Sequence, residues 1–188
     1  MSTEMHVLTN WYNGHRLVRY VTPPFESVTI GTQTWTAKNL AIDDGGTGIY
    51  TRVCDFGQGE ITEYYYTLEA AIRIVNNISG WHLPSKNEFD TLAAAVGGLS
   101  VACTKLKSTY GWEQPDEGTD DYDFTALPAG EWSGSFSDFG WAARFWTTTL
   151  YSTNIAYFCQ LYRATTSMNY NTSSIKYPAY SVRLIKDV

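Results

Sequence analysis

Residues 151–177 contain no Asp, Glu, Gly or Pro, although the chain of 188 residues carries 19 acidic residues and 15 glycines. A loop of that length should contain turn-forming residues, and an ordinary amphipathic element should show a steadier hydrophobic period. The stretch shows neither pattern. Its composition therefore raises the question of what surface it forms.

Basic clusters and long apolar runs are also missing. The 13 Lys and Arg residues are scattered through a chain of net charge -6 and pI about 5.0, so we expect no nucleic-acid partner. No apolar run approaches the roughly 20 residues that span a bilayer, so we expect no membrane insertion. The first 20 residues lack a charged region followed by an apolar core, and we expect no signal peptide in this chain.

Motifs for catalysis and metal binding are absent too. Cys54, Cys103 and Cys159 form no CxxC pair, which argues against a disulfide framework or a zinc site. The sequence has no G-x-S-x-G elbow, H-E-x-x-H helix or phosphate-binding loop, and its three histidines do not suggest a triad. We therefore expect no enzyme activity, no metal and no cofactor.

Aromatic residues are abundant, at 15% of the chain, with 14 Tyr and 7 Trp. Tyr and Trp each carry one polar atom that needs a partner, so such residues serve as half-buried framework or as contact surface. With 44% hydrophobic and 17% charged residues the chain is expected to be globular.

The first half of the chain predicts a short arm, a hairpin and two helices. Prolines in "TPPFE" separate an arm, residues 1–26, from a domain of residues 27–188, and "LVRYV" in the arm could pair as an edge strand. "SVTIGTQTW" predicts a hairpin that turns at Gly31, and residues 43–60 are rich in Gly and Asp and predict a surface loop.

Helical spacing of apolar residues predicts a first helix over about 67–77. A capping box of Ser85 and Glu88 begins a second helix, which Gly97-Gly98 ends. From residue 104 onward the apolar runs are short and β-prone, and "ARFWTTTL", "NIAYFCQLYR" and "YSVRLIK" predict strands. Helices followed by a β-rich half predict an α+β fold.

Seven stretches occur in the order typical of one known family: "VTIGTQTWTAKNL", "YYYTLEAAIRI", "GWHLPSKNEFDTL", "KLKSTYGW", "GTDDYDFTALPAG", "FWTTT" and "YSVRLIKD". Over residues 27–187 the chain thereby resembles the Fibrobacter succinogenes major paralogous domain family. That family is similar to the formylglycine-generating-enzyme type of the C-type-lectin fold, which implies two helices, small twisted antiparallel sheets and long loops. Leu184 stands where many relatives have Cys, and Ala179-Tyr180 replaces the usual Gly-Phe.

Two functions of related folds match this sequence poorly. Formylglycine-generating enzymes use a pair of cysteines, and only Cys159 lies in the corresponding region, so oxidase-like chemistry would require an unrecognised partner. Gln114-Pro115-Asp116 resembles a calcium and sugar motif of C-type lectins, but a solvated acidic turn explains residues 114–123 better than a calcium site. His82 is expected to be a framework residue.

The composition of residues 147–180 resembles an antibody paratope, with 6 Tyr, 4 Ser, 7 Thr and 3 Asn among 34 positions and only Arg163 and Lys176 charged. Tyr gives rigid contact area, and the small polar residues adapt their hydrogen bonds. Thr147–Thr149 are assigned to a strand framework, and "NYNTSSIKY" has too little apolar content to be buried.

Candidate ligand contacts are polar or aromatic residues of this stretch: Tyr151, Thr153, Asn154, Tyr157, Phe158, Cys159, Tyr162, Arg163, Asn169, Tyr170, Asn171 and Tyr177. The scaffold beneath them is predicted to consist of Trp146, Ala156, Leu161, Val182 and Leu184.

A second resemblance is to variable proteins of diversity-generating retroelements, which share this fold and vary near the C-terminus. Randomisation at adenine in asparagine codons yields residues of the types that dominate 151–174, with Gln160 and Met168 as framework exceptions, and Cys159 fits a randomised position. The resemblance implies a recognition protein for a protein or glycan on a cell surface, carried on a phage virion or a cell surface. The alternative is a carbohydrate-binding module with a fixed site, assisted by calcium at residues 114–123.

Overall fold

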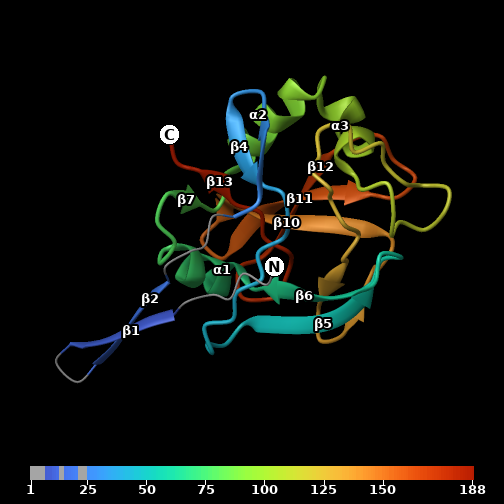
Figure 1. Cartoon of the computed structure of the whole chain (residues 1–188). Coiled ribbons are helices and arrows are strands. Elements are labelled where there is room, and N and C mark those ends of the chain that lie inside the picture. The colour runs from blue at the N-terminus through green and yellow to red at the C-terminus, as the bar shows by residue number, and fades with distance from the viewer. Residues whose placement is uncertain (1–6, 13–14, 21–24) are drawn as a thin grey trace.

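The computed structural model describes residues 7–12, 15–20 and 25–188. Within them the chain forms three helices and five small antiparallel sheets, which confirms the α+β class (Figure 1). The helices are α1 (Leu68–Val75), α2 (Lys86–Ala95) and α3 (Leu99–Leu106). The strands are β1 (Val7–Tyr12), β2 (His15–Tyr20), β3 (Ser27–Ile30), β4 (Gln33–Thr36), β5 (Ile49–Asp55), β6 (Glu60–Tyr66), β7 (Trp81–His82), β8 (Glu131–Trp132), β9 (Phe136–Ser137), β10 (Ala142–Ser152), β11 (Ile155–Tyr162), β12 (Asn169–Ser174) and β13 (Ile185–Lys186).

The sheet β10-β11-β12 lies at the centre, and β11 together with the first half of β10 is covered on both faces (Figure 1). Paired residues of antiparallel strands point to the same face, so Phe145 and Cys159 share one face and Trp146 and Phe158 share the other. The first pair packs in a core with α2 and α3, and the second packs in a core with α1. Burial on both faces makes β11 a rigid central element.

The C-terminal segment connects the parts of the domain. β13 lies between β4 and β7 in a four-stranded sheet, while Val182 and Leu184 are buried in the core with α1. Between them the buried Arg183 donates hydrogen bonds to the backbone carbonyls of Thr36, Phe124 and Thr125. A single side chain thereby holds the end of β4 against the distant 124–125 loop.

The two predicted helices are confirmed, and a third was missed. Thr67 caps α1, and Ser85 and Glu88 form the expected capping box of α2. Gly97 and Gly98 both have a positive φ and end α2, as predicted, but α3 begins at Leu99 directly after them. An eight-residue helix with its first residue exposed carries too little apolar periodicity to be recognised in the sequence.

The hairpin at Gly31 is confirmed as β3 and β4. The predicted loop over residues 43–60 is wrong in its second half, because β5 and β6 form a hairpin there. Cys54 and Tyr65 pack in a third, smaller core, but the apolar Val53 and Ile61 are exposed. Because apolar residues lie on both faces of this hairpin, its sequence does not show the alternation of apolar and polar residues that predicts strands. In the arm, the expected strand at "LVRYV" corresponds to β2, which pairs with β1. Residues 1–6, 13–14 and 21–24 of the arm lie outside the described residues.

In the described part of the chain, no single helix is both long and apolar enough to cross a membrane. One pair of helices, α2 and α3, bent by 82° at the break between them, meets that requirement of length and composition when the two are taken together.

Candidate recognition surface

The turn between β10 and β11 is an exposed part of the central sheet. Tyr151 has 64% of its surface exposed, and Ser152, Thr153 and Asn154 are also exposed. The pairing of β10 with β11 is irregular between Trp146 and Ser152, so the end of this hairpin departs from the buried part of the sheet. Large polar side chains therefore reach solvent directly beside a packed core.

The half-exposed Tyr157 and the exposed Thr172 extend this area along the sheet. The ring of Tyr157 contacts that of Tyr151 edge-on, with the ring centres 5.8 Å apart. Thr172 on β12 is paired with Tyr157 and is exposed on the same face. Tyr151, Thr153, Asn154, Tyr157 and Thr172 are called the Tyr151 surface below.

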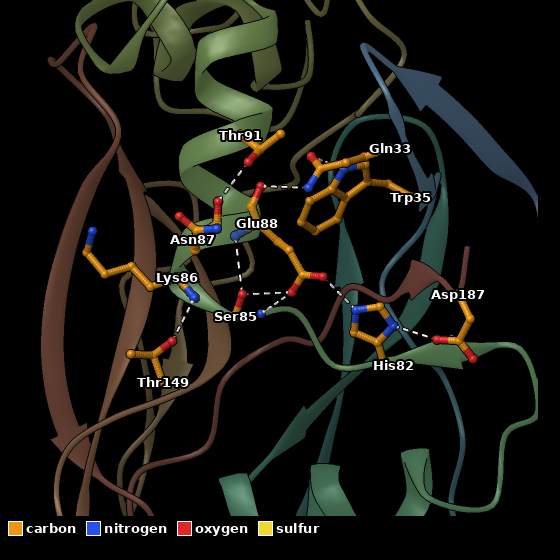
Figure 2. A network of polar contacts seen from close by, with 10 residues as sticks. All are labelled: Gln33, Trp35, His82, Ser85, Lys86, Asn87, Glu88, Thr91, Thr149 and Asp187. Carbon is orange, nitrogen blue, oxygen red and sulfur yellow. Dashed lines mark hydrogen bonds and ion pairs between the residues drawn. The ribbon is translucent and has the colours of Figure 1, made fainter.

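Helix α2 packs against Tyr170 of β12, on the same face of the sheet as Tyr157 and Thr172. The Tyr170 hydroxyl donates to a carboxylate oxygen of Asp90 at 2.8 Å, and Lys86 Nζ lies 4.2 Å from the centre of the Tyr170 ring and 2.9 Å from Asp90 Oδ2. Desolvation, together with the nearby Cys159 and Asp90, raises the pKa of Tyr170. The backbone N–H of Lys86 donates to Thr149 Oγ1 at 2.9 Å (Figure 2). Tyr170 is thus a fixed support at the border of the Tyr151 surface.

Phe158 and Cys159 are corrections to the predicted site. Phe158 contacts the rings of Trp146 and Tyr180, and Cys159 has 0% of its surface exposed. Both lie on the central strand β11, whose two faces are covered, so neither side chain can reach a partner at the surface. They belong to the scaffold, as do the five residues predicted for it: Trp146, Ala156, Leu161, Val182 and Leu184.

Tyr162 and Arg163 lie at the opposite end of β11 from Tyr151. Eight residues at about 3.3 Å each separate the two ends by roughly 25 Å. Arg163 forms an ion pair with Glu113, and its guanidinium lies 3.9 Å from the centre of the Trp141 ring. These two predicted contacts therefore form a separate area.

The remaining predicted residues are also distributed. Asn169 and Asn171 are exposed on β12, on the face opposite to Tyr170 and Thr172. Tyr177 is 45% exposed and packs edge-on against Trp132 at 5.5 Å, and Trp132 is stacked on Tyr50 at 3.4 Å. The structure therefore brings together Tyr151, Thr153, Asn154 and Tyr157, with Tyr170 beside them, and separates the others.

His82 lies in a polar network at the start of α2 (Figure 2). Its Nε2 is 2.7 Å from Glu88 Oε1 and its Nδ1 is 2.6 Å from Asp187 Oδ1. The other oxygen of Glu88 accepts from the backbone N–H and the hydroxyl of Ser85. Burial acts to lower the pKa of His82, but the two carboxylates outweigh it and the pKa is raised. Both ring nitrogens are engaged, as expected for a framework histidine.

The three cysteines are free and buried. Burial raises the pKa of each thiol, most strongly for Cys159. Thiolate chemistry is therefore disfavoured at all three.

The acidic loop is organised by its own hydrogen bonds. Asp120 accepts from the backbone N–H and the hydroxyl of Thr125, both at 2.7 Å. Among the residues that the structure describes, no group of three or more His, Cys, Asp or Glu side chains is placed to hold a metal ion.

A comparison with known protein families matches residues 28–186 to the Fibrobacter succinogenes major domain. This chain belongs to the Fibrobacter succinogenes major domain family. The matched region of this family member runs from β3 to β13 and contains the whole Tyr151 surface. No curated protein and no solved structure matches the chain.

Several residues of this family member's surface could not be found by sequence reasoning. Lys86 and Asp90 lie on α2, more than sixty residues before Tyr151, and the contacts of α2 with Tyr170 and Thr149 place them nearby. Thr172 lies in the polar stretch, where no sequence signal sets it apart, and its pairing with Tyr157 identifies it as part of the surface. Leu150 is exposed beside Tyr151 and carries no sequence signal of that exposure.

Proposed function

We propose that this member of the family is a non-enzymatic recognition domain with a C-type-lectin-like fold, which binds a protein or a glycan on a cell surface through the Tyr151 surface. The observation that carries the proposal is the exposure of Tyr151, Thr153 and Asn154 at the end of strands that are otherwise buried on both faces. Exposed aromatic and amide side chains on a rigid support are typical of a binding surface.

The support lowers the entropic cost of binding. Tyr157 is held by ring contact with Tyr151 and by the pairing of its strand with β10 and β12. Tyr has only two side-chain torsions, so little conformational freedom is lost when such a residue meets a ligand. The neighbouring hydroxyl and amide groups can then orient the ligand.

The proposal includes diversification of this surface by a retroelement, with the protein carried on a phage virion or a cell surface. The exposed positions 151, 153, 154 and 172 and the half-buried position 157 hold Tyr, Thr and Asn, which are residue types that adenine randomisation yields. Phe158 and Cys159 are not included, because a randomised residue there would disturb the core.

Two observations support the absence of catalysis in the proposal. The cysteine thiols are buried with raised pKa values, and both ring nitrogens of His82 bond to carboxylates. The thiols are therefore shielded from a substrate, and the ring nitrogens of His82 are occupied by their carboxylate partners.

A fixed carbohydrate-binding site is the second candidate, and one observation favours it. Tyr177, Trp132 and Tyr50 form a row of rings, of which Tyr177 is 45% exposed. Aromatic faces of this kind can pack on the apolar faces of sugars. The residues come from three separate elements and would form a platform independent of the Tyr151 surface.

A binding screen separates these candidates. The protein is applied to a glycan array and to a panel of bacterial cells, and the best target is tested with Tyr151→Ala, Tyr157→Ala and Tyr177→Ala. Loss of the Tyr151 or Tyr157 ring is expected to weaken binding about tenfold or more, because exposed Tyr anchors carry much of the binding energy, while Tyr177→Ala has little effect. A large loss of binding for Tyr177→Ala with little effect of Tyr151→Ala and Tyr157→Ala would support the fixed site and contradict the proposal. A binding signal that a chelator removes would do the same.

A further inference from the structure

A cavity of about 510 Å³ lies away from the Tyr151 surface, and none of that surface's residues lines it. It is bounded by the segment after β4, by β6 and by the loop at residues 123–127. Its volume is in the range of pockets that hold small molecules. The recognition function proposed above does not use it.

Glu63 is the central polar group of this cavity. The residue is 5% exposed, yet its side chain lines the cavity. Among the described residues its hydrogen-bond donor is the Asn39 side-chain amide, 2.9 Å from Oε2. A carboxylate can accept about four hydrogen bonds, so most of its capacity is unused. Desolvation raises the pKa of Glu63, and Asn39 and Arg183 only partly oppose this effect.

Arg183 is the nearest buried cation, but its donors are directed elsewhere. Its Nε donates to Asn39 Oδ1 at 2.7 Å, and its two terminal nitrogens donate to three backbone carbonyls. Asn39 therefore stands between the guanidinium and the Glu63 carboxylate and is held in one orientation. Arg183 fixes the amide that bonds Glu63 and forms no direct ion pair with Glu63.

The walls and the rim define what could enter. Apolar side chains from Ile61 and Leu127, with Ala37 and Ala41, line much of the cavity. At the rim Lys38 is paired with Glu26 at 2.8 Å, and Asp123 adds a further exposed carboxylate. The cavity thus offers a buried carboxyl group beside Arg183, apolar walls, and a rim that carries the Lys38–Glu26 pair and Asp123.

We propose that this cavity binds a small organic cation, a primary or secondary amine with a compact apolar body. The ammonium group donates to the free oxygen positions of Glu63, and the apolar body packs against Ile61 and Leu127. A charge-assisted hydrogen bond in such a buried setting is stronger than one between neutral groups. Arg183 and Lys38 also line the cavity, but Arg183 donates to Asn39 and to three backbone carbonyls, and Lys38 is paired with Glu26, so the free acceptor positions of Glu63 favour a donor ligand.

The test compares phenethylamine with 2-phenylethanol, which has nearly the same shape without the charge, by calorimetric titration near neutral pH. Wild-type protein should bind the amine roughly tenfold or more tightly than the alcohol, because only the amine can form a charge-assisted hydrogen bond with the Glu63 carboxyl group. Glu63→Gln should reduce the affinity for the amine to that for the alcohol. Glu60→Gln, an exposed carboxylate on the same strand, should leave it unchanged.

Leu127→Trp provides a second test that leaves the carboxylate in place, because its larger ring should fill the cavity and abolish binding of both compounds. The same binding of the amine by wild type, Glu63→Gln and Leu127→Trp, or no saturable binding by wild type, would overturn the proposal. Tyr151→Ala should leave amine binding intact, so failure here is distinguishable from failure of the recognition function.

Discussion

At the scale of single residues, exposure separates tyrosines that look alike in the sequence. Tyr151 is 64% exposed, whereas Tyr180 is 3% exposed and contacts the rings of Trp146 and Phe158, each at 4.6 Å. Tyr170 lies between these extremes, with its hydroxyl bonded to Asp90. Residue type alone therefore does not assign a tyrosine to the binding surface or to the framework.

This difference predicts opposite effects on stability. Tyr180→Ala should lower the free energy of unfolding by about 3 kcal/mol or more, because it leaves a cavity among packed rings. Tyr151→Ala should change it by less than about 0.5 kcal/mol, since an exposed ring loses few contacts. Urea denaturation of the two variants measures both values. A large loss for Tyr151→Ala would mean that this ring is part of the core.

At the scale of elements, the start of α2 connects to the C-terminus through His82. Glu88 belongs to the capping box of α2, His82 to β7, and Asp187 follows β13 (Figure 2). Protonated His82 can donate to both carboxylates, so its charge links three elements. The raised pKa of His82 makes this link dependent on pH.

The contribution of His82 to stability should be complete below its ordinary pKa of 6.5 and should be lost as pH rises through the raised pKa of the folded state. The difference in unfolding free energy between wild type and His82→Gln, measured by urea denaturation from about pH 6 to about pH 9, should therefore shrink with rising pH. Asp187→Asn should weaken this pH dependence. A difference that stays constant over the range would contradict the assignment.

At the scale of the whole molecule, local signals predicted much of the fold. The capping box at Ser85, the turn at Gly31 and the β-prone runs of β10 and β11 are short-range patterns, and all were confirmed. The packing of α2 and α3 over one face of the central sheet joins segments distant in the chain, and it buries Cys159 while Thr172 on the same face stays exposed. No local pattern in "IAYFCQLY" distinguishes these outcomes, because a central strand alternates between two buried faces.

The same reasoning applies to the candidate surface and to the cavity. Composition indicated the late polar and aromatic stretch, but tertiary packing selected which part of it forms one area. Glu63, Asn39 and Arg183 are separated by up to 144 residues in the chain and meet only in the fold. Sequence reasoning had no means of associating them.

Sequencing the 3′ end of the gene across a natural population, together with its flanking DNA, tests the central claim most directly. The account predicts a near-copy of this region beside a reverse transcriptase gene. Substitutions should be confined to positions that are adenine in that near-copy and should fall in the codons of residues 151, 153, 154, 157 and 172. Codons 146, 156, 159 and 161 should be unchanged. Codons of the Tyr151 surface that never change, or that change no more than those of the buried residues, would contradict it.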